Sequence, residues 1–130
     1  MNPADIDALV QADPLTLRPG MPIRRAAALL VEAGATSAPV TDDSGVLLGI
    51  LTQKDCFRPA LQASYYQEWS GSVADVMSSG AVTLPRGTDL FTAANAFLDH
   101  PHRAFPVTDG DRLTGMLHRS DVLRALLALG

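Results

Sequence analysis

The chain has 130 residues, of which 47% are hydrophobic and 18% charged, with ten basic against fourteen acidic residues. This composition is typical of one globular domain, and it excludes a disordered chain because enough apolar residues are present to build a core. The net charge of −4, without basic blocks, argues against a nucleic-acid binder and a basic membrane anchor. The apolar runs are too short to span a bilayer, and the first residues lack the pattern of a signal peptide. The single cysteine excludes an internal disulfide. Taken together, these features lead us to expect a soluble cytoplasmic protein.

The second half of the sequence repeats the first. Leu15-Thr16-Leu17 recurs 67 positions later as Val82-Thr83-Leu84, and Pro39-Val40-Thr41-Asp42 recurs at the same shift as Pro106-Val107-Thr108-Asp109. After the next turn the shift is 66, because the second copy has one residue fewer there. Roughly fifty residues therefore repeat in order, which is too long a match for chance.

The first copy has the pattern strand, helix, strand, strand, helix. Its expected elements are a strand at 15–17, a helix from Pro22 to Gly34, strands at 38–41 and 46–51, and a helix at 53–63. Proline suits a first helical turn and glycine ends a helix. The first helix carries an apolar stripe at helical spacing, formed by Ile23, Ala26, Ala27, Leu30 and Val31.

The second copy predicts the same elements. Thr88 is expected to cap a helix whose apolar face holds Leu90, Ala93, Ala94, Phe97 and Leu98, and strands follow at 105–108 and 113–117. Leu123, Leu126 and Leu127 form the apolar face of the last helix. Three short strands and two helices close no core alone. We therefore expect an α+β fold of two β-α-β-β-α repeats, related by a pseudo-twofold axis and packed sheet to sheet, with boundaries at 7–63, a linker at 64–72, and 73–130.

The turn before the last helix of each copy carries the main functional signal. In the first copy, Thr52 and Asp55 have the spacing of a capping box, which stabilises a helix by about 1 kcal/mol. The alternative is that they face a ligand at a helix N-terminus, where free N–H groups favour a phosphate. In the second copy, His118 stands where Thr52 does, so Asp121 keeps its register while its capping partner is lost. Ser120 is the alternative cap there.

The paired Pro-Val-Thr-Asp strands, the turn Gly-Ile-Leu-Thr-Gln-Lys-Asp at 49–55 and Asp75-Val76-Met77-Ser78 together resemble the cystathionine-β-synthase (CBS) domain family. A tandem pair of this kind is a Bateman module. The resemblance implies a stand-alone, non-catalytic regulatory module that needs no cofactor. It would bind an adenosyl nucleotide, such as AMP, ADP, ATP, NADH or S-adenosylmethionine, in clefts between repeats, form a homodimer and signal to an unknown target protein. The alternative is a protein-interaction scaffold with empty clefts.

The same resemblance implies roles for particular residues. Asp55 and Asp121 would hold the ribose, and Thr52 would contact ribose or phosphate. Four further residues would shape the adenine pockets, namely Thr16, Val40, Thr83 and Val107. His118 departs from the family pattern, and its protonation would make phosphate affinity dependent on pH. Lys54 and Arg119 place a cation in each first turn, which a bound phosphate would stabilise. Arg103 is a further phosphate candidate, although exposed surface is the favoured interpretation.

Other residues have simpler interpretations. Cys56 is expected to be a small buried hydrophobe, and His100-Pro101-His102 a loop rather than a metal site. Tyr65, Tyr66 and Trp69 are expected to close the seam between the copies, with a patch for another subunit as the alternative. The Ala26–Leu30 stripe is expected to be core, and its small side chains would also permit contact with a second chain. No catalytic triad, phosphate loop or metal-ligand spacing is present, which argues against an enzyme.

Overall fold

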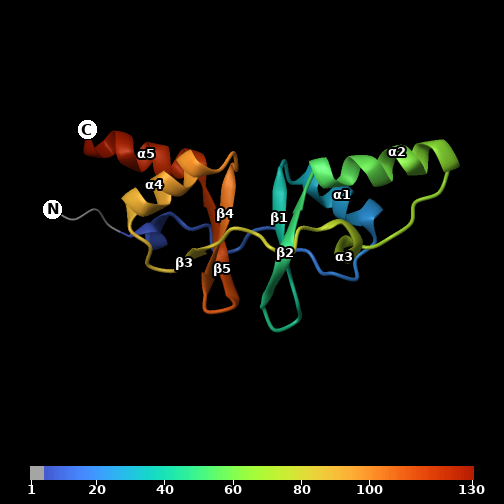
Figure 1. Cartoon of the computed structure of the whole chain (residues 1–130), viewed down its shortest axis with the longest axis horizontal. Helices are drawn as coiled ribbons and strands as arrows, with labels where there is room; N and C mark the ends of the chain where they lie inside the picture. The colour runs from blue at the N-terminus through green and yellow to red at the C-terminus, as the bar shows by residue number, and fades with distance from the viewer. Residues whose placement is uncertain (1–4) are drawn as a thin grey trace. The chain divides into compact units, whose positions relative to one another are not determined.

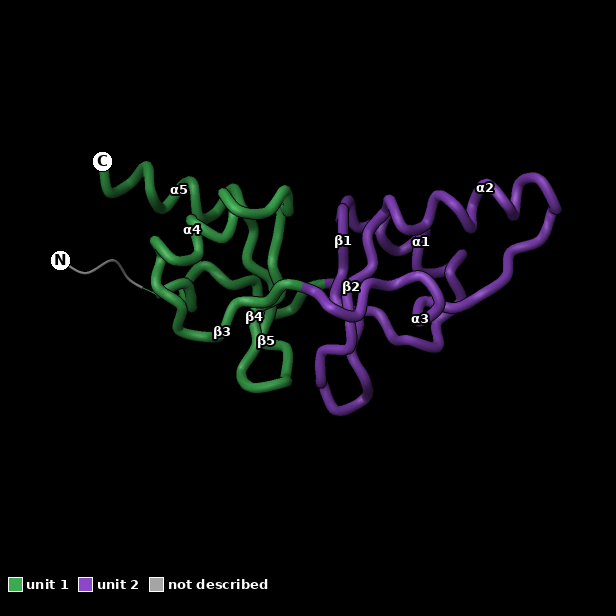
Figure 2. Tube along the Cα trace, in the orientation of Figure 1, with its two compact units in different colours: residues 1–14, 82–130 green, residues 15–81 purple. Residues whose placement is uncertain are grey.

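The computed structural model describes residues 5–130, which form two compact units. The first-repeat unit comprises residues 15–81, and the second-repeat unit joins residues 5–14 to residues 82–130 (Figure 2). The spatial units therefore differ from the sequence repeats, because each unit includes the segment that leads into the other repeat. Residues 5–14 are fixed to the second-repeat unit by Ile6, whose side chain is fully buried in its core.

The first-repeat unit is built on a two-stranded antiparallel sheet (Figure 1). Its elements are α1 (Ile23–Glu32), β1 (Ser37–Thr41), β2 (Leu47–Thr52), the 3-10 turn η2 (Lys54–Cys56), α2 (Phe57–Tyr66) and α3 (Val73–Val76). The strand expected at 15–17 is reduced to one parallel bridge between Leu17 and Val40. The helix expected at 53–63 is wrong at both ends, since α2 begins after η2 and continues to Tyr66, inside the expected linker.

Local chemistry explains the ends of these elements. Gly34, at a φ of +63°, follows the last turn of α1, a backbone conformation that glycine adopts without strain. Pro22 is the N-cap of α1 rather than part of its first turn, which corrects the expectation. In the β1–β2 turn, the Asp42 carboxylate accepts hydrogen bonds from the N–H groups of Ser44 (2.9 Å) and Val46 (3.0 Å). The predicted turn at 42–45 is therefore confirmed.

The second-repeat unit has a three-stranded sheet of order β3-β4-β5, in which β3 runs parallel to β4 and β5 antiparallel. Its elements are η1 (Ile6–Leu9), β3 (Leu84–Pro85), α4 (Leu90–Asp99), β4 (Ala104–Asp109), β5 (Arg112–His118) and α5 (Arg119–Leu129). The expected cap Thr88 is wrong by one residue. Asp89 is the N-cap of α4, and its carboxylate accepts hydrogen bonds from the Thr92 N–H (2.9 Å) and the Thr92 hydroxyl (2.6 Å).

Replacing Asp89 by alanine is expected to lower the unfolding temperature, because α4 loses both of these bonds. The hydrogen bonds from Thr92 hold the pKa of Asp89 below its usual value. The stabilisation is therefore fully present above about pH 4 and is lost as the pH falls through the lowered folded-state pKa. Melting curves recorded from neutral to acidic pH check this. Asp89→Ala should lose less stability on acidification than the unmodified chain, and an equal acid dependence would contradict the assignment.

In each unit, a segment that leads into the other repeat crosses the sheet. Ile50 in β2 and Ser78 exchange two backbone hydrogen bonds of 2.9 Å. Met116 in β5 and Gln11 exchange the equivalent pair, at 2.8 and 3.1 Å. The residue before each bridge is a glycine with no room for a side chain, since a Cβ on Gly49 would lie 2.5 Å from the Ser78 carbonyl oxygen. This close approach explains why glycine stands at both repeat positions.

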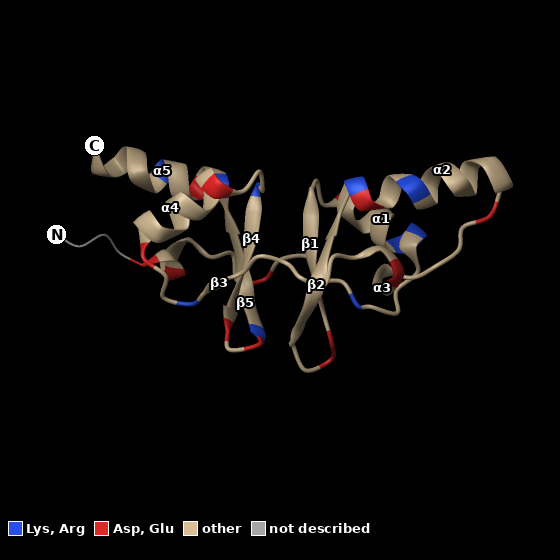
Figure 3. Cartoon of the chain, in the orientation of Figure 1, with Lys and Arg blue, Asp and Glu red and all other residues tan. Residues whose placement is uncertain are grey.

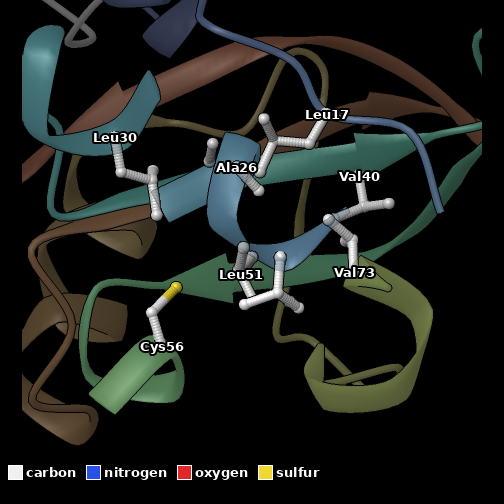
Figure 4. Close-up of a cluster of buried hydrophobic side chains, with 9 residues drawn as sticks. Leu17, Ala26, Leu30, Val40, Leu51, Cys56 and Val73 are labelled. Atoms are coloured by element: carbon white, nitrogen blue, oxygen red, sulfur yellow. The ribbon is translucent and has the colours of Figure 1, made fainter. Parts of the chain in front are cut away.

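Each unit has its own hydrophobic core. In the first-repeat unit, side chains from α1, both strands, η2 and α3 meet (Figure 4). They are Leu17, Ile23, Ala26, Leu30, Ala38, Val40, Leu51, Cys56 and Val73. The stripe of α1 is core as expected at Ile23, Ala26 and Leu30, whereas Val31 is 69% exposed. Leu98, Leu123 and Leu127 of the second-repeat unit are also exposed, so the apolar faces of these helices are wider than the cores they cover.

Candidate functional site

The turn that joins β2 to α2 contains a complete capping box. The Thr52 N–H donates to Asp55 Oδ2 at 2.9 Å, and the Asp55 N–H donates to Thr52 Oγ1 at 3.1 Å. The capping interpretation of these two residues is therefore confirmed. The second carboxylate oxygen, Asp55 Oδ1, accepts no hydrogen bond from the described residues, and the Asp55 side chain is only partly buried. A capping role thus leaves Asp55 able to accept further hydrogen bonds.

A cleft of about 510 Å³ lies beside Asp55, within the first-repeat unit. Its walls come from η2 and α2, from the start of α1, and from the segment that leads into and through α3. The lining residues are Ile23, Lys54, Asp55, Arg58, Pro59, Gln62, Ser70, Gly71, Asp75 and Val76. Asp55 and Lys54 thus line the same cleft. The Thr52 N–H holds the Asp55 carboxylate through its hydrogen bond to Oδ2.

The charged side chains that line this cleft differ in whether they have a partner. Asp75 is held by its own capping box, in which its Oδ2 accepts from the Ser72 N–H at 2.8 Å. Lys54 and Arg58 are exposed, and no carboxylate of residues 5–130 lies within ion-pair distance of either. Charged residues of both signs mark the start of α2 (Figure 3). The cleft therefore offers two cations to an anion and one carboxylate oxygen to a hydroxyl donor.

Sequence reasoning missed Arg58 and Gln62. Both lie on α2 and line the cleft with Lys54 of η2. The three residues follow one another at steps of four, and side chains at this spacing are neighbours on a helix. That spacing was the available signal. The sequence indicated Asp75 only as part of a family motif. Its place at the cleft depends on how α3 packs beside η2 and α2, which are distant in sequence.

The corresponding turn of the second-repeat unit is arranged differently. His118 is the N-cap of α5 but forms no side-chain cap, and Ser120 lies inside α5 rather than capping it. The His118 Nε2 atom is hydrogen-bonded to Gln11 Oε1 at 2.9 Å. Asp121 accepts from the Arg124 guanidinium, with Nη1 and Oδ1 2.8 Å apart. The capping box predicted to be lost here is indeed absent from this turn.

The phosphate candidates of this unit lie at its surface. Arg119 and Arg103 are both exposed, and the Arg119 N–H donates to the Arg103 carbonyl at 2.8 Å. This bond joins the start of α5 to the segment before β4 through the backbone. It leaves both guanidinium groups facing solvent.

The residues expected around adenine lie on the central strands or next to them. Val40 and Val107 are fully buried in the two cores, so neither offers side-chain surface to a ligand. Thr16 and Thr83 are partly buried, each one residue before the position that pairs with Val40 or Val107. Each threonine is thus next in sequence to the residue that pairs with its valine. Only the threonines keep exposed surface.

Cys56 is buried as expected, and its thiol lies 3.5 Å from the Thr52 carbonyl oxygen. Burial, with a smaller effect of the Asp55 charge, raises the pKa of the Cys56 thiol. A raised pKa favours the protonated thiol, which is the unreactive form. Cys56 is therefore a core residue.

The remaining expectations have mixed outcomes. His100 and His102 lie outside helices and strands, and residues 5–130 contain no group of three or more side chains that could hold a metal ion. Tyr65 and Tyr66, at the end of α2, are 81% and 73% exposed. Trp69 packs against the first-repeat core. None of the described helices is long and apolar enough to cross a membrane.

Comparison with known proteins gives one consistent family. The family model of the CBS domain matches twice, at residues 5–60 and 73–128. The chain is 30% identical over 120 residues to inosine-5'-monophosphate dehydrogenase of Mycobacterium leprae, covering 91% of this chain and 21% of that enzyme. It is 27% identical over 139 residues to the chloroplastic CBS domain-containing protein CBSX2 of Arabidopsis thaliana, covering 87% of this chain and 58% of CBSX2. The chain thus spans about a fifth of the length of the mycobacterial relative.

Solved structures show the same fold. The crystal structure of CBSX2 in complex with AMP superposes with a TM-score of 0.83 at 27% identity, covering 97% of this chain and 98% of that one. The mixed α+β architecture described above is therefore that of CBS-pair structures.

Proposed function

Because the chain belongs to the CBS domain family, we propose that it is a regulatory module that binds an adenosyl nucleotide without transforming it. The observation that carries the proposal is the turn at Asp55, where a capped carboxylate with one unused oxygen borders a cleft with two unpaired cations. The AMP complex of CBSX2 supports the choice of ligand class. AMP, ADP or ATP, NADH and S-adenosylmethionine are the candidates.

The ligand would use the chemistry of this turn directly. A ribose presents two neighbouring hydroxyl groups, and Asp55 Oδ1, the carboxylate oxygen that Thr52 leaves free, would accept hydrogen bonds from them, the logic that dinucleotide-binding folds use. Lys54 and Arg58 would attract the phosphates, since charge-assisted hydrogen bonds to phosphate are stronger than neutral ones. Thr52 would position the carboxylate, and Thr16 would contribute the polar edge of the adenine site. The equivalent residues Asp121, His118, Arg119, Thr83 and Arg103 stay predictions.

Binding would change the relative populations of two arrangements of the module. A nucleotide that binds one arrangement of the module more tightly than another stabilises that arrangement in proportion to the difference in affinity. The signal would then pass to a target protein in the cytoplasm, whose identity the chain does not reveal. A module of this kind needs no catalytic group of its own.

We further propose that the module is a homodimer. Three positions are apolar and exposed in both units, with side chains between 56% and 82% exposed. The matched pairs are Val31 and Leu98, Phe57 and Leu123, and Leu61 and Leu127. Exposed apolar patches mark interaction surfaces, and a patch present at equivalent places in two repeats suits a symmetric partner. A second copy of the chain is such a partner.

Thermal melting with AMP, ATP, NADH and S-adenosylmethionine tests the binding proposal. A ligand at 100 times its dissociation constant should stabilise the fold by about 2.7 kcal/mol. Asp55→Asn should abolish this shift, because asparagine keeps an oxygen for the Thr52 N–H but loses the charge and a second acceptor. Asp89→Asn is the matched control, since Asp89 is also a capping aspartate but does not line the cleft. A shift that survives Asp55→Asn would place the site elsewhere.

The second candidate function is a protein-interaction module that binds no nucleotide. Tyr65 and Tyr66 favour it, because the two rings meet edge to face at 5.0 Å on the surface at the end of α2. Exposed tyrosines are enriched in protein interfaces. No shift with any of the four nucleotides would favour this function over the first.

A further inference from the structure

Two of the three histidines of the chain lie together at the connection between α4 and β4 (Figure 1). The ring centroids of His100 and His102 are 5.4 Å apart, and the two rings also pack against Phe105, at 5.9 and 5.4 Å. Phe105 is fully buried and packs in turn against Phe97, with centroids 4.6 Å apart. The two imidazole rings are therefore held side by side on aromatic side chains of the second-repeat core.

The ring nitrogens of this histidine pair have no hydrogen-bond partner among residues 5–130. The one histidine side chain of that range with a hydrogen bond is His118, which contacts Gln11. His102 is exposed and His100 is half-buried. Ring packing thus fixes the position of the two imidazoles, while their nitrogens remain available to a ligand.

The fold itself does not require these histidines. The same helix-to-strand connection in the first repeat, 67 positions earlier, has the sequence Ala33-Gly34-Ala35, and Ala38 stands where Phe105 does. The first repeat therefore makes this connection without an aromatic ring at any of these positions. In the second repeat, Pro101 restricts the backbone between the two histidines, because its ring fixes φ. The His-Pro-His sequence is thus a feature of the second repeat alone, and the need to connect a helix to a strand does not explain it.

Two free imidazoles suit a divalent transition metal ion. Imidazole is a common ligand of Ni²⁺, Cu²⁺ and Zn²⁺, whereas Mg²⁺ and Ca²⁺ prefer oxygen. With metal–nitrogen distances of about 2.0–2.1 Å, two imidazoles on one tetrahedral ion have ring centroids about 5 Å apart. The centroids of His100 and His102 have nearly this separation. Because His102 is exposed, its ring can turn toward a shared ion without moving the core.

The charges around the histidine pair permit a cation. His100 is the C-cap of α4, and the carbonyl end of a helix is the negative end of its dipole. The last turn of α4 ends at Asp99 and contains no basic residue. Arg103 is the cation next to the pair in sequence, and it is exposed, where solvent and salt screen its repulsion.

We propose that His100 and His102 bind one divalent transition metal ion per chain, of the class of Ni²⁺, Cu²⁺ and Zn²⁺, with water in the other coordination positions. The described residues contain no group of three or more side chains that could hold a metal ion, so this site is open, unlike a structural zinc site with four protein ligands. Sequence alone favoured a plain loop here, because the ring contacts with Phe105 are not visible in it. The site is separate from the proposed nucleotide cleft, which lies in the first-repeat unit.

Isothermal titration calorimetry of the full chain, carrying no affinity tag, with Ni²⁺ tests the inference. We expect one ion per chain, competition by Cu²⁺ and Zn²⁺, and no competition by Mg²⁺. His102→Ala should weaken binding at least tenfold and keep the melting curve of the unmodified chain, because this side chain is exposed. His118→Ala, which removes the third histidine, is the matched control and should leave the affinity within twofold. Absence of Ni²⁺ binding, or binding that survives His102→Ala, would overturn the inference.

Nuclear magnetic resonance locates the ion independently. The chain has three histidines and therefore three sets of imidazole signals. The spectra of His102→Ala and His118→Ala assign two of these sets, and the third belongs to His100. A substoichiometric amount of paramagnetic Cu²⁺ should broaden the signals of His100 and His102 and leave those of His118 sharp. Broadening of the His102 signals alone would show that the two imidazoles do not share an ion, and would contradict the proposed site.

Discussion

Replacing Gly49 by alanine is expected to destabilise the first-repeat unit by about 1–3 kcal/mol, the cost of forcing atoms into a well-packed site. The new Cβ would lie 2.5 Å from the Ser78 carbonyl oxygen and 3.1 Å from the Met77 sulfur. The nearest atom belongs to backbone, so no side-chain rotation relieves the clash. The segment at Ser78 must move away, and its two hydrogen bonds to Ile50 then lengthen or break.

Denaturant unfolding measures this effect, and the chain supplies a matched control. A Cβ on Gly80 meets nothing within 4 Å, so Gly80→Ala should change the free energy of unfolding by less than about 0.5 kcal/mol. Gly115→Ala should behave as Gly49→Ala does, because its Cβ would collide with the Gln11 carbonyl oxygen and lie 2.6 Å from Val10 Cγ1. A Gly49→Ala variant as stable as Gly80→Ala would show that the crossing segments are not tightly held.

The repeat in the sequence shows that glycine occupies both positions, but not why. The reason is a pairing between β2 and a segment almost thirty residues further along the chain, and between β5 and a segment about a hundred residues earlier. Local patterns report periodicity and turn chemistry, and they predicted the strand pairs, the turn at Asp42 and the capping box at Thr52 correctly. Local patterns carry no information about which segment, distant in sequence, pairs with a given strand.

The errors have the same origin. Thr88 and Asp89 are both good N-cap residues, and only the backbone conformation decides that Asp89 caps α4. Val31 belongs to the apolar stripe of α1 but is exposed, since periodicity cannot separate a side chain facing the core from one facing a partner. The Asp121–Arg124 pair and the His118–Gln11 contact likewise depend on side-chain geometry. The capping box of the first turn and its loss in the second were therefore predictable, whereas the partners that His118 and Asp121 take instead were not.

Replacing Leu61 and Leu127 by glutamate together is expected to convert the proposed homodimer to a monomer. Both side chains are about as exposed as a surface polar residue, at 67% and 72%, so the substitutions remove little from either core. In a dimer they would be buried, and burying one leucine contributes about 1.5–3 kcal/mol. A symmetric interface uses each position twice, so each substitution acts twice. A loss of about 3 kcal/mol per position weakens association more than a hundredfold.

The control for this double variant is Ala28→Glu. Ala28 is exposed on α1, but its counterpart in the second repeat is the polar Asn95, so it lies outside the matched apolar positions. Sedimentation velocity at micromolar concentration should show a dimer for the unmodified chain and for Ala28→Glu, and a monomer for the double variant. A monomeric unmodified chain, or a double variant that stays dimeric with an unchanged melting curve, would remove these helical faces from the interface. The paired exposure of equivalent residues would then require a different partner.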